Sequence, residues 1–348
     1  MTSVGPVLRP LRRDDAEAFW RLVSEHVDDL TGMTSLPHSL ESAIEQAIVS
    51  NEVVVDLAAG RLHLDRGFGR SLFFVLVEPD GRLIGASGVL FKDRVLNLAV
   101  QVRTSDDGTG LVARSSSATW TRTELNSTFL ATAGRGRGHG TLLSRGRMLF
   151  LLIVGSQIPS LLVSHLRGVF DSDGTAPFWR TFGARFLPEW PTSPDAERAL
   201  QHDPARIASL SSRVIALTPE VLRSLGPVNA ASHPAFHSLR AEGLRPNGMY
   251  DPVDGGPTIT RQLGQTSSAR TRIVGTATLI DDAGSGAGSE AVDALVSSVN
   301  IGEFAATRAR VVLRGDGEVG LTSAIGARLG VEPGALVSAV PLGAGRTP

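Results

Sequence analysis

The sequence of 348 residues has no cysteine and a single lysine, Lys92. Without cysteine the chain can form neither a disulfide nor a thiol nucleophile, so acyl transfer through an acyl-cysteine intermediate is excluded. The glycine-rich stretches contain no lysine, which excludes a Walker phosphate loop ending in Gly-Lys-Ser/Thr. For an acyl transfer, direct attack by a bound amine is then the simplest route.

The chain also lacks a strong net charge and a long apolar run. A formal net charge of -1 and a pI near 6.7 give no bulk attraction for nucleic acid or an anionic membrane. The longest apolar run, Met148 to Val154, is far too short to span a bilayer, and the first residues lack the apolar core of a signal peptide. These absences predict a soluble, cytoplasmic protein without nucleic-acid or membrane partners.

What the chain does have is a run of alternating glycines between residues 135 and 141. Before it, residues 124–130 are rich in β-branched and apolar residues and predict a strand. After it, residues 142–152 have apolar residues at helical spacing, with Arg145 and Arg147 on the opposite face. Glycines allow a sharp turn and close approach of a ligand, and amides at a helix N-terminus carry a partial positive charge. The run therefore predicts an anion site suited to a pyrophosphate.

The spacing within this run separates the candidate motifs. A Rossmann Gly-x-Gly-x-x-Gly fingerprint fits only in a poor register. Arg-x-x-Gly-x-Gly does fit, and it resembles the acyl-CoA pyrophosphate loop of the GNAT acyltransferase superfamily. The alternative is a glycine-rich loop without a ligand, since short glycine motifs also arise by chance. The residues expected to bind the co-substrate on this resemblance are Arg135, Gly136, Arg137, Gly138, His139, Gly140 and Thr141, with Arg145 as a further phosphate contact.

The remaining pattern predicts an α/β (α+β) fold, a GNAT-type mixed sheet with flanking helices. Strands are expected at 7–11, 71–77, 83–89 and 160–166, the last parallel to 124–130 and buried on both faces. Helices are expected after Asp14-Asp15, after Ser39, and at 220–225 and 235–241. Residues 1–265 would form this domain, with an insertion or loop at 188–206. Residues 266–348 would form a small β-rich unit with a mobile segment at 281–290.

Seven segments, in order along the chain, carry a closer resemblance than the superfamily. They are Met33-Thr34-Ser35-Leu36-Pro37, Glu124-Leu125-x-x-x-Phe129-Leu130, Gly138-x-Gly140-x-Leu142-Leu143-Ser144-Arg145-x-Arg147, Leu166-Arg167-Gly168-Val169, Pro177-Phe178-Trp179, Glu242-Gly243 and Asp254-Gly255-Gly256-Pro257-Thr258. The chain resembles bacterial arginine N-succinyltransferases in these segments. The resemblance implies transfer of a succinyl group from succinyl-CoA to the α-amine of arginine, with succinyl-CoA as co-substrate and with neither a permanently bound cofactor nor a metal.

The chain departs from that family at the position of its proton donor. The family has a catalytic histidine in a Gly-x-Val-His segment, whereas this chain reads Gly226-Pro227-Val228-Asn229. Asparagine cannot exchange a proton near pH 7, although it can hydrogen-bond. A second departure is Thr128, where the family has a leucine whose backbone contacts the acyl-CoA. The resemblance also implies that Ser35 and Asp254 bind the amine substrate.

Other residues are candidates to carry the proton in place of Asn229. Glu124, on the strand beside the glycine run, would relay it from the amine, although it could equally be paired with an arginine. His233 follows Asn229 closely, although an exposed histidine is the plainer interpretation. His165 is expected to be a satisfied core residue.

Two other functions stay open on the sequence. One is a non-catalytic family member that binds CoA or assembles with an active partner in a homo- or hetero-oligomer. The other is a GNAT enzyme that acts on another amine or another acyl-CoA.

Overall fold

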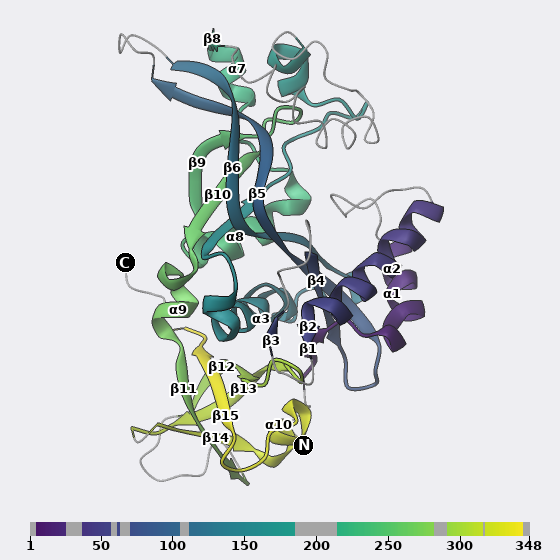
Figure 1. Ribbon diagram of the computed structural model, residues 1–348, viewed down its shortest axis with the longest axis vertical. Helices are drawn as coiled ribbons and strands as arrows, with labels where there is room; N and C mark the ends of the chain where they lie inside the picture. Colours follow the sequence, from purple (N-terminus) through teal and green to yellow (C-terminus); the bar gives the residue numbers. More distant parts are fainter. Residues whose placement is uncertain are drawn as a thin grey trace.

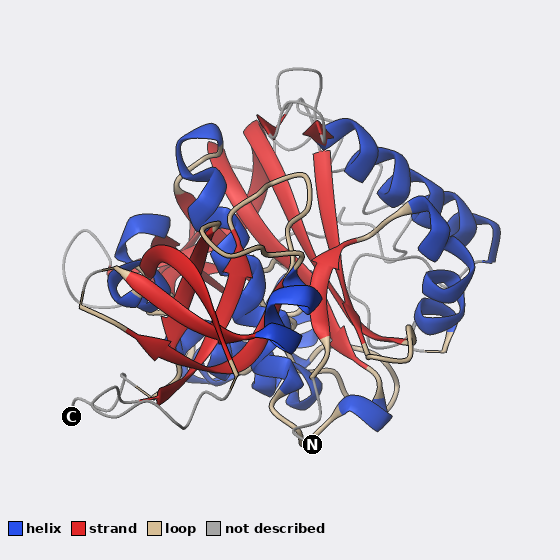
Figure 2. Ribbon diagram, turned by 90° about the horizontal axis from the view of Figure 1, so that it is seen from below, coloured by secondary structure: helices blue, strands red, loops and turns tan. Residues whose placement is uncertain are grey.

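The computed structural model describes residues 5–25, 37–56, 61–62, 70–104, 111–184, 214–281, 291–315 and 317–343. The loop with Ser35, the expected insertion at 188–206 and residues 282–290 lie outside this part of the chain. Thirteen of the described strands form one sheet in the order β12-β15-β11-β14-β13-β1-β4-β5-β9-β10-β7-β6-β8, and β2 pairs with β3. This mixed sheet with flanking helices confirms the expected α/β fold class (Figures 1 and 2).

The strands have the following bounds: β1 Val7–Pro10, β2 Val55–Asp56, β3 Arg61–Leu62, β4 Arg70–Val77, β5 Leu83–Thr104, β6 Leu111–Leu130, β7 Leu161–His165, β8 Val214–Ala216, β9 Arg245–Tyr250, β10 Pro257–Gln262, β11 Ile273–Ile280, β12 Ala291–Ser298, β13 Ala306–Leu313, β14 Glu318–Thr322 and β15 Leu336–Pro341. The α-helices are α1 Ala16–Ser24, α2 Pro37–Val54, α3 His139–Val154, α7 Pro219–Ser224, α8 His233–Ala241, α9 Ser267–Thr271 and α10 Ser323–Leu329. Shorter helical turns are η1 Arg13–Asp15, η3 Thr132–Gly134, η4 Gly155–Gln157, η5 Trp179–Gly183, η6 Ala230–Ser232 and η7 Leu263–Gln265.

The central strand β4 separates two apolar layers by simple alternation. Its residues Leu72, Phe74 and Leu76 belong to the core cluster around α3, whereas Phe73, Val75 and Val77 belong to the cluster around α1 and α2. Successive side chains of a strand point to opposite faces, so a strand buried on both faces reads as continuously apolar. Helices therefore cover both sides of the central strands, as Figure 2 shows.

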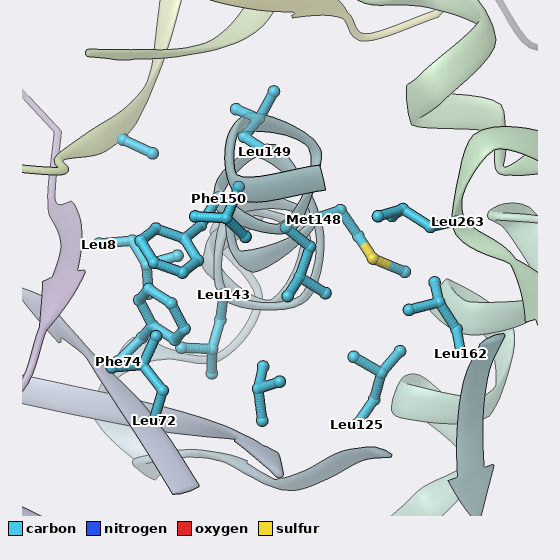
Figure 3. Packing of buried hydrophobic residues seen from close by; sticks show 14 of the residues in the cluster. Leu8, Leu72, Phe74, Leu125, Leu143, Met148, Leu149, Phe150, Leu162 and Leu263 are labelled. Atoms are coloured by element: carbon cyan, nitrogen blue, oxygen red, sulfur yellow. The ribbon is translucent and has the colours of Figure 1, made fainter. Parts of the chain in front are cut away.

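Helix α3 occupies the centre of the larger core. In Figure 3 it lies between Leu8, Leu72 and Phe74 on one side and Leu125, Leu162 and Leu263 on the other. The rings of Phe74, Phe150 and Phe304 meet edge to face, with centroids 5.1 to 6.0 Å apart. Phe304 precedes β13, so α3 is packed against both the main sheet and the C-terminal strands.

The C-terminal strands close on themselves and remain attached to the main sheet. β12 pairs with β13 as well as with β15, which completes a closed set of five strands with its own apolar cluster. β13 also pairs with β1 through Val7↔Thr307 and Leu8↔Ala306. Hydrogen bonding is thus continuous between the first described strand and the β-rich unit, which lies at the bottom of Figure 1.

Two local expectations were wrong. Ser39 lies inside α2, which begins at Pro37, so it does not cap that helix. Arg147 was expected opposite the apolar face of α3, as a phosphate contact or on a solvated face, but it is 1% exposed. Its Nη1 donates to the carbonyl oxygens of Gly88 and Asn126 at 2.9 and 3.2 Å, which explains why a cation is tolerated there. Burial lowers the pKa of Arg147 to about 10. Within the described residues, no helix combines the length and apolarity that crossing a membrane requires.

Candidate active site

β6 and β7 pair in parallel over a short distance and then separate. Their register contains only Thr123↔Leu162 and Glu124↔Val163. Past these pairs, Ser164 Oγ donates to the carbonyl oxygen of Leu125 at 3.0 Å. The strand before the glycine run and the strand after α3 therefore diverge where the chain approaches the glycines, as in the crossover unit expected from the sequence.

A β-bulge lies on β6 between this divergence and the glycine run. Phe129 pairs with Ala86 and Asn126 with Gly88, so Ser127 and Thr128 together stand opposite Ser87. Ser127 has φ 46°, a conformation that a residue with a Cβ adopts only under constraint. Arg147 donates to carbonyl oxygens on both strands beside the bulge and so fixes it. The bulge turns the backbone of Thr128 out of the regular ladder.

The glycine run forms a turn that leads directly into α3. Gly136 and Gly138 have φ 80° and 78°, which favours glycine at both positions, and Gly138 is the N-cap of α3. Thr141 and Leu142 both donate their N–H groups to the carbonyl oxygen of Gly138, at 3.1 and 3.4 Å. The earlier amides of a helix have no intrahelical acceptor, and no acidic residue stands in the first turn. This helix start is therefore open to an anion.

Three arginine side chains lie on or near the glycine turn, two from the turn itself and one from β13. Arg135 and Arg137 are exposed, and Arg135 Nε donates to the carbonyl oxygen of Leu130 at 3.0 Å. A Cβ built on Gly138 would stand 2.9 Å from Nη1 of Arg308, a residue of β13 that sequence reasoning missed. The β-rich unit thus brings a guanidinium to the turn. No local pattern could have indicated it, because residue 308 lies far along the chain.

Arg145 does not fit its expected role as a phosphate contact. Its Nε donates to Oε1 of Glu242 at 2.6 Å, and Nη2 lies 3.4 Å from Oγ of Ser268. Glu242 is 1% exposed and also accepts hydrogen bonds from N and Oγ of Ser268. A buried carboxylate that loses its cation is costly, so this arginine joins α3, α8 and α9.

A cluster of polar side chains from β5, β6, β7 and β10 shares one face of the sheet. We call it the charged cluster; it consists of Lys92, Arg122, Glu124, His165 and Thr258. Oε2 of Glu124 lies 2.9 Å from Nζ of Lys92, 3.2 Å from Nη2 of Arg122 and 3.8 Å from Nε2 of His165. Burial opposes the ionisation of Glu124, but His165, Lys92 and Arg122 outweigh it and lower its pKa to about 2. Burial lowers the pKa of Arg122, which Glu124 partly offsets.

The low pKa changes the interpretation of Glu124. A carboxylate that stays ionised down to about pH 2 is a very weak proton acceptor, so Glu124 does not fit the role of proton relay. The expected alternative, a carboxylate paired with arginine, describes its contacts with Arg122 and Lys92. Of the cluster, sequence reasoning singled out only Glu124 and His165. Arg122 pairs with Lys92 across β5 and β6. This pairing cannot be predicted from the sequence unless the register of the two strands is known.

His165 is not the satisfied core residue that the sequence predicted. Its side chain is 37% exposed, although it is the last residue of a strand whose preceding residues are buried. Nδ1 lies 3.0 Å from Oγ1 of Thr258, which is its antiparallel partner on β10. The imidazole therefore stands at the divergence of β6 and β7 with one nitrogen held and one side open to solvent.

Asn229 and His233 lie just beyond the same end of β7. The backbone N–H of Asn229 donates to the carbonyl oxygen of Arg167 at 2.9 Å, and its Oδ1 accepts from the N–H of Ala231 at 3.0 Å. The asparagine is thus the N-cap of η6. His233 is exposed, and its Nε2 donates to the carbonyl oxygen of Val228 at 2.9 Å, which leaves that nitrogen unable to accept a proton.

Asp254 forms a turn that packs tightly against residues 166–168. Its Oδ1 accepts from the N–H of Gly256 at 2.7 Å, and a Cβ on Gly256 would clash with the carbonyl oxygen of Leu166. Burial and the negative charge of Asp251 raise the pKa of Asp254 to about 7. Its carboxyl is engaged with the backbone N–H groups of Gly256 and Gly168. Ser35, the other expected substrate residue, lies outside the described residues.

Comparison with known proteins gives consistent results. Residues 113–268 match the family model described as arginine N-succinyltransferase beta subunit. Arginine N-succinyltransferases of Shigella flexneri and Escherichia coli are each 28% identical, over 290 and 293 residues, which are 76% of this chain and 78% of theirs. The chain is thus similar to arginine N-succinyltransferases over 76% of its length. Arginine/ornithine succinyltransferase subunit AI from Pseudomonas aeruginosa has the same fold, with a TM-score of 0.76 and 22% identity over 98% of this chain and 100% of that one.

This similarity supports a CoA-dependent N-acyltransferase, with an acyl-CoA as co-substrate. The matched region covers β6 from residue 113 onward, the glycine run, α3, β7 and the charged cluster except Lys92. Most of the features described above thus lie in the part of the chain that the family model covers, whereas Lys92 and Arg308 lie outside it.

Proposed function

We propose that this chain transfers the succinyl group of succinyl-CoA to the α-amine of arginine. The observation that carries the proposal is the junction of the diverging strands β6 and β7 with the glycine turn, inside the region that matches the family. The open amides at the start of α3 suit the pyrophosphate, and the displaced backbone of Thr128 suits the contact with the acyl-CoA. Because both CoA thioesters and arginine are cytoplasmic metabolites, a cytoplasmic location follows from the same proposal.

The reaction needs no covalent enzyme intermediate. The lone pair of the free α-amine attacks the thioester carbonyl carbon, and the C–S bond breaks as the amide forms. The nitrogen loses one proton as the amide forms, and the CoA thiolate leaves and takes up one proton. Holding the two reactants in position is worth more than any single proton transfer, so a chain with Asn229 in place of histidine can still catalyse the reaction.

The direct test is thiol release from succinyl-CoA on addition of arginine, with mass spectrometry of the product. Succinylarginine is the expected product. Ornithine belongs in the same assay because the similar Pseudomonas protein is described as an arginine/ornithine succinyltransferase. Modification of a different amine, with arginine left intact, would move the chain to another acyltransferase specificity.

One observation favours a second function. Asn229 supplies a helix cap and cannot exchange a proton, which suits a family member that binds CoA within an oligomer and leaves catalysis to a partner. This version predicts that CoA raises the thermal midpoint while no thiol is released with any amine. Size-exclusion chromatography with light scattering would then measure the oligomeric state on which that function depends.

A further inference from the structure

His165 lies beside the divergence of β6 and β7, and the proposed function requires a group that takes a proton from the amine. It ends β7, at the point where β7 no longer pairs with β6. Glu124 pairs with Val163, and His165 is two residues farther along, so both side chains lie on the same face. Within that cluster His165 is the most exposed of the ionisable side chains, at 37% against 0% to 20% for the others. A substrate arriving from solvent can therefore reach it.

The hydrogen bonds of His165 suit a neutral imidazole that accepts a proton at Nε2. If Nδ1 carries the hydrogen, it donates to Oγ1 of Thr258 at 3.0 Å. Nε2 is 3.8 Å from Oε2 of Glu124, which is beyond hydrogen-bond distance, so its lone pair is available. After Nε2 takes up a proton, the carboxylate is near enough to stabilise the imidazolium.

Burial, more than the surrounding charges, favours the neutral form of the His165 imidazole near pH 7. Burial lowers its pKa, the Glu124 carboxylate raises it, Arg122 and Lys92 lower it, and Asp251 raises it slightly, with a net decrease from the ordinary value of 6.5. These groups come from β5, β6 and the turn after β9, and Thr258 faces it from β10. Glu124 is ionised throughout this range and so acts as a charge partner and not as the base.

Asn229, at the position of the family's histidine, lies near His165 in the fold. Residue 229 donates its backbone N–H to Arg167, two residues beyond His165. A histidine on β7 thus stands at the same end of the strand as Asn229. Of the two, only the imidazole can exchange a proton.

We propose that His165 is the catalytic base of this chain, taking one proton from the α-ammonium group of the substrate while Thr258 and Glu124 hold and stabilise the imidazole. The freed nitrogen lone pair then forms the bond to the thioester carbonyl carbon. The proton on His165 passes to solvent, and the second proton lost by the nitrogen neutralises the CoA thiolate. The proposal rests on the proposed function, since it assigns a role in that reaction.

The test compares wild type with His165→Gln, which keeps a polar side chain beside Thr258. Near pH 7 we expect kcat/KM to fall about 100-fold or more. The defect should shrink as the pH rises, because the amine then loses its proton without a base. A merely structural role would give a defect that does not depend on pH. An unchanged thermal shift with CoA would show that the variant is folded and binds its co-substrate. His237→Gln, an exposed histidine of α8, is the matched control.

The outcomes separate the two proposals. If wild type releases no thiol with arginine or ornithine, the proposed function fails, and this role of His165 fails with it. If wild type turns over and His165→Gln keeps both its rate and its pH profile, only the assignment of His165 is overturned. Loss of turnover in His233→Gln together with full turnover in His165→Gln would also overturn it and place the base on α8.

Discussion

Within the candidate site, the glycine turn comes from one short run of residues, whereas the charged cluster comes from four strands. The turn is exposed, and what it offers a ligand is the backbone amides at the start of α3. The cluster is largely buried and works through side chains whose charges compensate one another, with Arg122 at 0% exposure and Glu124 at 12%. Substitutions in the turn should therefore leave the fold intact but weaken ligand binding. Substitutions in the charged cluster should affect both folding stability and activity.

The largest expected effect is on the stability of the cluster. Glu124→Gln leaves the cations of Arg122 and Lys92 without their shared carboxylate, and breaking a buried pair costs about 3–5 kcal/mol. Urea denaturation would measure the change in the free energy of unfolding. The matched control is Glu17→Gln, which breaks the exposed pair of Glu17 with Arg21 and should cost no more than about 0.5 kcal/mol. Equal losses of unfolding free energy in the two variants would show that the ion pairs of Glu124 contribute no more to stability than an exposed pair does.

The next effect concerns the ligand of the glycine turn. A Cβ on Gly140 meets nothing within 4 Å and its φ is not positive, so Gly140→Leu should fold normally while its side chain occupies the anion site. At 100 times its Kd, a ligand stabilises the folded state by about 2.7 kcal/mol, and this CoA-dependent stabilisation should disappear. The thermal midpoint with and without CoA measures it.

Gly264→Leu is the matched control for that variant. Gly264 lies in η7, also has open space around its Cβ and has no positive φ, so the CoA shift should survive the substitution. Retention of the shift in both variants would place CoA elsewhere on the chain.

The same contrast explains which features the sequence could predict. Gly138 and Gly140 lie within one turn, so a motif with fixed spacing identifies them, and the apolar periodicity of β4 and α3 likewise predicted their place in the fold. The charged cluster joins Lys92, Glu124 and His165 through strand register, and register depends on a bulge at Ser127 that no local pattern indicates. The apolar residues before His165 predicted a buried strand and hence a packed imidazole. They do not show that β7 ends at His165, where the side chain is exposed.

A smaller effect links pH to the turn at Asp254. Its pKa in the folded state, about 7, is above the ordinary 3.8, so the folded state holds the proton more tightly. The resulting stability is fully present below about pH 4 and is lost as the pH rises through 7. Asp254→Asn cannot ionise and keeps an oxygen for the N–H of Gly256. It should exceed wild type in stability at pH 8, by on the order of 1 kcal/mol or more, and by much less at pH 5.

Thermal midpoints at the two pH values check this prediction. Asp80→Asn is the control, since Asp80 is exposed and its Oδ1 also accepts a backbone N–H, from Arg82. A stability difference for Asp254→Asn that is the same at both pH values would mean that the carboxyl is not protonated in the folded state near neutrality.

The smallest expected effect is on CoA affinity at the glycine turn. Among the described residues, Arg308 is the one side chain of the β-rich unit that lies beside Gly138. An exposed cation next to a bound phosphate is worth about 0.5–1 kcal/mol, so Arg308→Gln should raise the Kd of CoA about two- to fivefold. Isothermal titration calorimetry measures it, and the difference should fade near 1 M salt, where screening acts over ~3 Å. Arg314→Gln removes another exposed arginine of the unit, paired with Glu318, and is the control.

Replacing Asp293 should have the opposite effect on CoA affinity to replacing Arg308. Its Oδ2 accepts from Nη2 of Arg308 at 2.9 Å, so the carboxylate competes with any phosphate for the guanidinium. Asp293→Asn should therefore lower the Kd of CoA, by no more than Arg308→Gln raises it, and should change nothing when Arg308 is already replaced. If the double variant instead shows the sum of the two single effects, Arg308 and Asp293 act independently, and the β-rich unit contributes to CoA binding only through its net charge.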